Sequence, residues 1–143
     1  STRVRSSAAS DVYKRQMEYS DSLKKNNEFQ RVYRKGTSQA NRYLVMYVLE
    51  NHDRHMENRL GISVSKKVGN SVVRHRVTRL IRESYRLNER SFRQGLDIVV
   101  VARPNAKDKS YQEIESALMH LAGRMKIRRE AELYVEESKK AEE

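Results

Sequence analysis

The sequence predicts a single α+β domain, an α/β sandwich in which helices pack on a mixed β-sheet. Three segments read as strands, two amphipathic segments read as helices, and a strongly basic helical segment lies before the last strand. The expected order is helix, strand, strand, basic helix, strand, helix, which places helices and sheet in separate layers. The 143 residues are enough for one domain with one modest core.

The first predicted helix covers residues 26–35. Phe29, Val32 and Tyr33 lie at positions i, i+3 and i+4, and Gly36 is placed to form the C-terminal turn. Periodicity alone is explained by ordinary core packing of the two aromatic side chains. A surface role for them needs a further argument.

Two strands are expected to follow this helix. Residues 41–50 alternate between two sets that are both apolar, which indicates a strand covered on both faces, or covered on one while the other forms an aromatic cleft. Residues 59–65 alternate apolar and polar side chains, with Leu60, Ile62 and Val64 on one face. The polar residues 52–58 between them are expected to form a hairpin loop.

The basic segment, residues 66–86, begins with two lysines, turns at Gly69, and has Asn70 or Ser71 as the predicted N-cap of a helix. An apolar set shares one side of that helix: Val73, Val77, Leu80, Ser84 and Leu87. A basic set shares another side, with two further arginines on its flanks: His75, Arg79, Arg82 and Arg86, flanked by Arg74 and Arg76. One face can therefore be buried while the other meets an anionic partner.

Charge is concentrated in this part of the chain. Residues 66–93 contain nine Lys or Arg against two Glu, which is +7 of the formal net charge of +11. Clustered basic side chains are typical of nucleic-acid binding, and arginine suits planar, bidentate contact with phosphates. A solvated basic face is the alternative interpretation. So many like charges repel one another unless a partner neutralises them, which favours a polyanion.

The last strand and helix are well marked. Residues 96–102 form a nearly continuous apolar run, typical of a buried strand, and Pro104 follows it. Ser110 and Glu113 form a capping box for an amphipathic helix. That helix is expected to pack on the sheet through Ile114, Leu118, Leu121 and Met125.

No catalytic or metal-binding constellation stands out in the sequence. There is no Cys, hence no thiol nucleophile, disulfide or Cys-based zinc site. His52 and His55 lack a convincing third ligand nearby, and the remaining histidines are scattered. Neither paired carboxylates nor a nucleophile with a base at motif spacing is visible, so we expect no catalytic residue and no metal site in the protein itself.

We expect residues 1–16 to be a disordered or non-native extension, residues 17–127 to form the domain, and residues 128–143 to be a charged tail. No apolar run approaches the roughly 20 residues of a membrane span, and residues 1–16 lack the apolar centre of a secretory signal. We therefore expect a cytoplasmic protein without membrane contact.

Residues 63–83, SVSKKVGNSVVRHRVTRLIRE, resemble the signature of the bacterial ribonuclease P protein family, in which an Arg-Asn-Arg motif follows Ser-x-Lys-Lys-x-Gly-Asn. Here the motif is Arg74-His75-Arg76, and Thr78 stands where a basic residue is usual. Residues 23–36 and 40–49 are also similar to the family, and the resemblance extends over residues 23–127. It implies the order αβββαβα, a mixed sheet of about four strands, and a left-handed βαβ crossover.

The resemblance also implies a function. Such a protein is the accessory subunit of ribonuclease P, an endoribonuclease whose RNA subunit cuts the 5′ leader from precursor tRNA with Mg²⁺ held mainly by RNA. The partners would be the catalytic RNA and precursor tRNA, with no protein partner required. Combined with the charge pattern, the resemblance leads us to expect contact with the catalytic RNA from a basic set: Lys66, Lys67, Arg74, His75, Arg76, Arg79, Arg82 and Arg86. It assigns a leader-binding cleft, on which bases can stack, to Phe29, Tyr33 and Tyr47.

Three other functions remain as alternatives. A ribosomal-type or general RNA-binding protein would share the basic helix but would need no aromatic cleft. A helix-turn-helix DNA-binding protein is disfavoured because a strand, not a short helix, precedes the basic helix. An independent protein nuclease is disfavoured because no acid/base constellation is visible.

Overall fold

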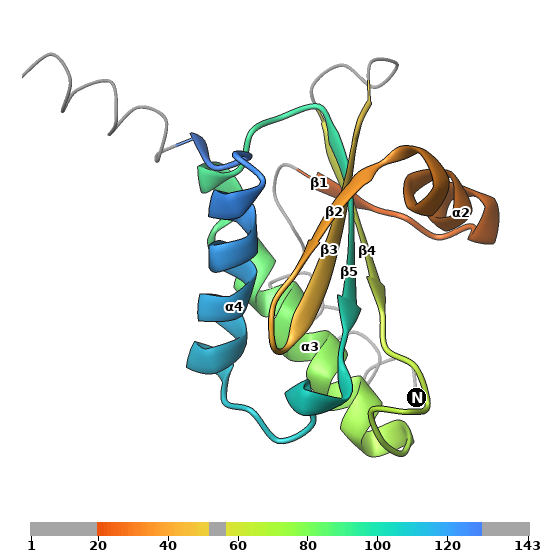
Figure 1. The fold of residues 1–143 in the computed structure, drawn as a ribbon, viewed down its shortest axis with the longest axis vertical. Helices are drawn as coiled ribbons and strands as arrows, with labels where there is room; N and C mark the ends of the chain where they lie inside the picture. The colour runs from red at the N-terminus through yellow and green to blue at the C-terminus, as the bar shows by residue number, and fades with distance from the viewer. Residues whose placement is uncertain (1–19, 52–56, 130–143) are drawn as a thin grey trace, which may run out of the picture.

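Three helices and a five-stranded sheet make up the computed structural model, which describes residues 20–51 and 57–129 (Figure 1). The α+β class is therefore confirmed. The elements are β1 (Ser20–Ser22), α2 (Asn26–Lys35), β2 (Thr37–Ala40), β3 (Leu44–Glu50), β4 (Asn58–Ser63), α3 (Ser71–Leu87), β5 (Leu96–Ala102) and α4 (Tyr111–Arg124), with single 3₁₀ turns at Glu89–Ser91 and Pro104–Ala106.

The sheet is mixed, with the strand order β1-β4-β5-β3-β2. β4 pairs in parallel with β1 and β5, whereas β3 pairs antiparallel with β5 and β2. From α2 onward the elements follow the αβββαβα order that the resemblance implies, but β1 adds a fifth strand. Its sequence, Ser-Asp-Ser, has no apolar alternation, so no sequence pattern marked it as a strand.

The prediction that residues 52–58 form a hairpin loop between two neighbouring strands is wrong. β3 and β4 follow one another in the chain, but β5 lies between them in the sheet. The apolar β5 is buried along almost its whole length. As the central strand it has a neighbouring strand on each edge, and helices pack on both faces of the sheet. His52 and His55, in the connecting segment, lie outside the described residues. The left-handed β4–α3–β5 crossover stays a prediction.

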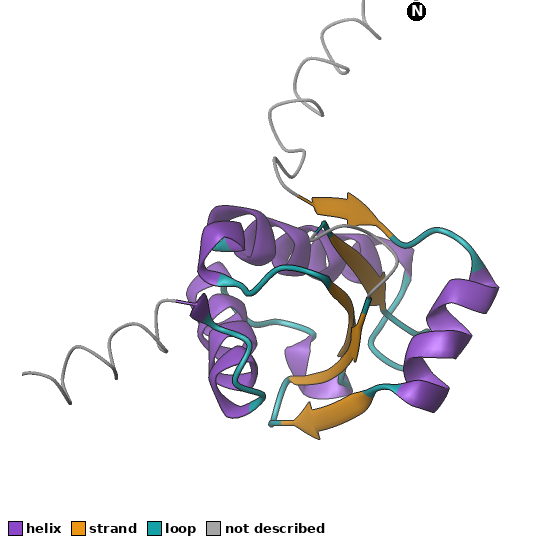
Figure 2. Ribbon diagram, turned by 90° about the horizontal axis from the view of Figure 1, so that it is seen from above, coloured by secondary structure: helices purple, strands orange, loops and turns teal. Residues whose placement is uncertain are grey.

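Helices α3 and α4 cover one face of the sheet (Figures 1 and 2). Alternate residues of β3 and β5 point into this layer, where they meet the apolar faces of both helices. The fully buried side chains include Leu44, Met46, Ile98, Val100, Val77, Ile81, Ile114, Leu118 and Leu121. Burial of this apolar area is the main stabilising contribution to the fold.

The buried stripe of α3 differs from the predicted one. Val77 and Ser84 are buried as expected, but Leu87 is 58% exposed, and the stripe also includes Ile81 and Tyr85. Tyr85 packs on Phe92 with ring centroids 4.8 Å apart. Because α3 contacts both the sheet and α4, its buried stripe is wider than the sequence pattern suggested.

The helix caps are largely as predicted. The Asn70 side chain accepts a hydrogen bond from the backbone N–H of Val73 at 3.0 Å, and Ser110 and Glu113 form the expected capping box. Gly36 does not make a left-handed turn, because its φ is −82°. It is needed for space instead: a Cβ atom there would lie 2.7 Å from the carbonyl oxygens of Val32 and Val48.

Candidate nucleic-acid interface

Helix α3 and the turn before it present the predicted basic residues. Within the described residues, six of the eight are exposed: Lys66, Lys67, His75, Arg76, Arg79 and Arg82. They are exposed because Val77, Ile81 and Tyr85 turn the opposite side of the helix into the core. We define these six residues as the α3 surface, which carries five full positive charges and a histidine.

The two remaining residues of the predicted basic set, Arg74 and Arg86, are less accessible to a partner. Arg86 is half-buried and forms an ion pair with Glu83, to which its Nε donates at 2.8 Å. Arg74 is half-buried too, and its Nε is a buried donor without an acceptor among the described residues. Sequence spacing could have revealed the Glu83 pairing, since the two residues lie three positions apart on a helix.

Three aromatic side chains meet on the face of the sheet opposite α3 and α4. They are Phe29 and Tyr33 of α2 and Tyr47 of β3. The rings of Phe29 and Tyr33 have centroids 6.5 Å apart, and those of Tyr33 and Tyr47 lie 4.9 Å apart at 74°. All three residues are half-buried over the fully buried Val99 of β5. The structure therefore places the predicted aromatic residues side by side, and we call this group the aromatic cluster.

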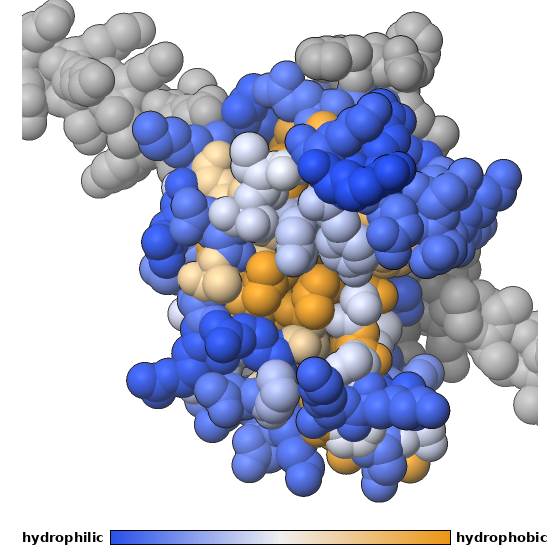
Figure 3. Space-filling model, turned by 45° about the vertical axis from the view of Figure 1, so that its right-hand side comes forward, coloured by the Kyte–Doolittle hydropathy of each residue, from blue (hydrophilic) through white to orange (hydrophobic). Residues whose placement is uncertain are grey.

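The aromatic cluster is both core and surface. Phe29 packs on Gly61, where a Cβ atom would lie 2.7 Å from the ring, while partial exposure leaves parts of the rings open to solvent. Apolar surface continues through Leu49 and Val101, which pack on the same core cluster. Figure 3 shows an apolar patch on this side of the molecule, bordered by hydrophilic surface. Exposed aromatic rings of this kind can stack on nucleic-acid bases of any sequence.

The two surfaces lie on opposite faces of the sheet. Met46 of β3 points into the layer under α3 and α4, whereas its neighbour Tyr47 points to the side of α2. This follows from the two-residue period of a strand. The arrangement allows the protein to contact two separate segments of nucleic acid at once.

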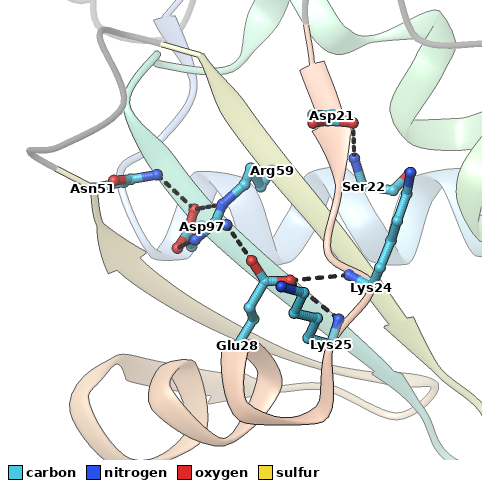
Figure 4. A network of polar contacts seen from close by, with 8 residues as sticks. All are labelled: Asp21, Ser22, Lys24, Lys25, Glu28, Asn51, Arg59 and Asp97. Carbon is cyan, nitrogen blue, oxygen red and sulfur yellow. Dashed lines mark hydrogen bonds and ion pairs between the residues drawn. The ribbon is translucent and has the colours of Figure 1, made fainter.

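A buried ion network fixes α2 on the sheet (Figure 4). Arg59 of β4 donates two hydrogen bonds to the carboxylate of Asp97 on β5, at 3.0 and 2.7 Å, and one to Glu28 of α2 at 2.6 Å. The side-chain amide of Asn51 donates to Asp97 at 2.9 Å. Sequence reasoning missed this network because its members are widely separated in the chain and no periodic pattern links them.

Two members of the network, Glu28 and Arg59, are stabilised in their charged forms. The backbone N–H of Lys25 donates to the Glu28 carboxylate and lowers its pKa, with smaller contributions from the Lys24 N–H and from Arg59. The hydrogen bonds from Arg59 to Asp97 raise the pKa of Arg59 further above its ordinary value. Glu28 precedes Phe29 directly, so the ion pair between Glu28 and Arg59 positions the first turn of the helix that carries the aromatic cluster.

The part of the chain that the structure describes holds no group of three or more His, Asp or Glu side chains arranged to bind a metal ion. Nor does any helix in these ranges have the length and apolar character of a membrane span. The expectation that the protein carries no catalytic residue of its own stays a prediction.

Comparison with known proteins agrees with this arrangement. The family model described as Ribonuclease P matches residues 17–126. The ribonuclease P protein component of Lachnoclostridium phytofermentans is 64% identical over 108 residues, covering 76% of this chain and 91% of the relative. That of Alkaliphilus metalliredigens is 54% identical over 111 residues, covering 78% and 98%.

Solved structures give the same result. The ribonuclease P protein of Staphylococcus aureus superposes with a TM-score of 0.68 at 42% identity, covering 77% of this chain and 97% of that one. The protein from Thermotoga maritima superposes with a TM-score of 0.66 at 28% identity, covering 73% and 96%. By its sequence and its fold, the chain belongs to the ribonuclease P protein family.

Proposed function

We propose that this protein binds the catalytic RNA of ribonuclease P and the 5′ leader of precursor tRNA, and thereby promotes endonucleolytic removal of the leader. The observation that carries the proposal is the placement of the α3 surface and the aromatic cluster on opposite faces of one sheet. A general RNA-binding protein would need only the first of these surfaces.

The α3 surface suits the catalytic RNA. Its five full positive charges lie on one helix and the turn before it, and the carboxylate of Glu83 on the same helix pairs with Arg86, which is not one of the five. Binding to a folded RNA neutralises these charges and releases counterions from the phosphates, which favours association at low salt. The arginines add planar, bidentate contacts.

The aromatic cluster suits the leader. A leader varies in sequence, and stacking on an aromatic ring depends little on which base is presented. Exposed cations on α2, Arg31, Arg34 and Lys35, can attract the backbone of the same strand. Because mature tRNA has no leader, contacts at this cluster favour precursor over product.

The chemistry is assigned to the RNA subunit. We propose that Mg²⁺ is held mainly by the catalytic RNA and supplies the activated water and charge neutralisation for hydrolysis of one phosphodiester bond. A basic protein surface repels a metal cation, and RNA phosphates attract one. The protein then acts by holding and orienting the two RNAs in the cytoplasm, without a further protein partner.

Reconstitution tests this proposal. Adding the purified protein to a ribonuclease P RNA at low Mg²⁺ should raise the rate of precursor cleavage, measured by release of a labelled leader. The protein contributes positive charge that Mg²⁺ must otherwise supply, so the stimulation should shrink as Mg²⁺ rises. Binding without stimulation would support the alternative of a general RNA-binding protein. Cleavage by the protein alone would contradict the assignment of chemistry to the RNA.

Salt dependence tests the α3 surface. We expect Arg79→Gln combined with Arg82→Gln to weaken binding to the catalytic RNA and to flatten the slope of log K against log salt by about 1.4–1.8, since each lost phosphate contact removes about 0.7–0.9. Both side chains are exposed, so the fold should persist. Arg34→Gln with Lys35→Gln removes two exposed cations from α2 and serves as the matched control. An equal slope change in both double variants would contradict a dedicated α3 surface.

A further inference from the structure

We propose that a groove between residues 41–43 and helix α4 is a second binding site for the catalytic RNA, which takes an unpaired segment of it. This inference rests on the proposed function and extends it to a surface outside both the α3 surface and the aromatic cluster. We call it the α4 groove. It is an open depression of about 450 Å³.

The walls of the α4 groove come from two distant parts of the chain. Asn41, Arg42 and Tyr43 form one wall, and residues of α4 form the other, including Gln112, Ser116 and His120. The Asn41 side-chain amide donates to the carbonyl oxygen of Ala117 at 2.9 Å and lies 3.3 Å from Nδ1 of His120. The backbone carbonyl oxygen of Asn41 accepts a hydrogen bond from Nη1 of Arg103 at 2.8 Å. These bonds fix the groove before any ligand arrives.

Positive charge surrounds the same turn. Arg42 is exposed, Arg103 binds the Asn41 carbonyl, and the ammonium of Lys109 lies 5.3 Å from the centroid of the Tyr43 ring. Arg124 donates to the carbonyl oxygen of Ala40 at 3.4 Å. Four cations thus gather at residues 40–43: Arg42 belongs to this segment, Arg103 and Lys109 come from the connection between β5 and α4, and Arg124 comes from α4.

The carboxylate that lines the groove is already engaged. Glu113 accepts hydrogen bonds from the backbone N–H and the hydroxyl of Ser110, each at 3.1 Å, in the capping box of α4. The N-terminus of the helix is satisfied in this way. The other nearby carboxylate, Asp108, lies 3.9 Å from the ammonium of Lys109. Four cations thus face two carboxylates at this turn, and the groove favours a polyanion.

The side chains inside the groove favour unpaired nucleotides. Tyr43 and His120 provide flat rings, and Asn41 and Gln112 provide amides that can donate to or accept from a base edge. Proteins recognise unpaired RNA through such rings and amides, because its bases can be turned out of the stack. The cations at the rim are placed for phosphates.

Continuity with α3 selects the catalytic RNA as the occupant. Nη2 of Arg76, a member of the α3 surface, donates to the carbonyl oxygen of Lys109 at 2.9 Å. The α3 surface and the groove rim therefore adjoin. The aromatic cluster proposed to hold the leader lies on the other face of the sheet.

Site-directed crosslinking tests the α4 groove directly, because this sequence contains no cysteine. Ser116→Cys and Val72→Cys each introduce one thiol at an exposed position, the first in the groove and the second on α3. A short photoreactive label on each thiol should crosslink to the catalytic RNA in the reconstituted complex. The Ser116 label is expected to map to unpaired nucleotides.

The outcomes separate the two proposals. Crosslinking from Val72→Cys but not from Ser116→Cys overturns the α4 groove and leaves the proposed function intact. Crosslinking of the Ser116 label to precursor tRNA, or to paired nucleotides only, also overturns it. Absence of crosslinks from both positions, together with no stimulation of cleavage, overturns the proposed function itself.

Binding supplies an independent measurement. Arg42→Gln with Lys109→Gln should weaken binding to the catalytic RNA about 10-fold and flatten its salt slope by about 1.4–1.8. The ratio of precursor to mature tRNA affinity in the complex should stay unchanged. Arg34→Gln with Lys35→Gln, which removes two exposed cations proposed to attract the leader, should give the opposite result: an unchanged affinity for the catalytic RNA and a lower precursor-to-mature ratio. In Arg42→Gln with Lys109→Gln, an unchanged affinity for the catalytic RNA, or a changed precursor-to-mature ratio, would overturn the assignment.

Discussion

Asp97→Ala is expected to lower the free energy of unfolding by about 3–5 kcal/mol, because it leaves the buried guanidinium of Arg59 without its main partner. The Asp97 side chain is 1% exposed and that of Arg59 is 9% exposed, so water cannot replace the lost contacts. Small domains have a total free energy of unfolding of about 5–15 kcal/mol. The substitution therefore threatens the folded state as a whole.

Urea denaturation of the purified protein measures this effect. Glu57→Ala is the matched control, because it removes a carboxylate at an exposed position next to β4 and should change the free energy by less than about 0.5 kcal/mol. Replacing both partners with apolar side chains, Arg59→Met with Asp97→Leu, should recover much of the loss. A cost for Asp97→Ala similar to that of Glu57→Ala would show that the network does not stabilise the fold.

Tyr33→Ala is expected to reduce the preference for precursor over mature tRNA by about 5- to 150-fold, which corresponds to stacking of about 1–3 kcal/mol on one base. Tyr33 lies between the other two rings, 6.5 Å from Phe29 and 4.9 Å from Tyr47, so its removal opens the centre of the aromatic cluster. Dissociation constants of the reconstituted complex for both tRNAs give the result.

Tyr33→Phe is the control for this prediction, because it keeps the ring and removes only the hydroxyl. It should retain most of the preference for precursor. Binding of mature tRNA is an internal check on folding, since a damaged protein would lose both ligands. Equal weakening for precursor and mature tRNA in Tyr33→Ala would argue that the aromatic cluster serves only as core.

The two predictions are linked through α2. Glu28 joins Arg59 to the first turn of the helix, and Phe29 follows at once in the chain. Phe29 also packs directly over Gly61, two residues after Arg59 on β4. The ion network and the aromatic cluster thus share one helix and one strand. A variant that weakens the network without unfolding the protein is expected to loosen the leader-binding surface.

Much of the candidate site could be predicted from the sequence because it depends on local patterns. The α3 surface follows from helical spacing, and the cap at Asn70 follows from the residue types that satisfy free N–H groups. The family resemblance brought Phe29, Tyr33 and Tyr47 together as a cleft. Periodicity by itself allowed ordinary core packing, and the structure shows the three side chains side by side, packed on the core and partly exposed, while their role as a leader-binding cleft stays a prediction.

The sequence pattern alone determined three helices, three strands and their order, together with the capping residues and the position of the basic helix, because each is encoded over a few neighbouring residues. It did not mark the polar strands β1 and β2, and a strand at the place of β2 was expected only from the family resemblance. The tertiary structure decided which strands are neighbours, and so placed β5 between β3 and β4. It also decided the partners of Arg59 and the meeting of residues 41–43 with α4. These contacts join residues 31 to 79 positions apart, and a separation of that size is set by sheet topology, which no local pattern records.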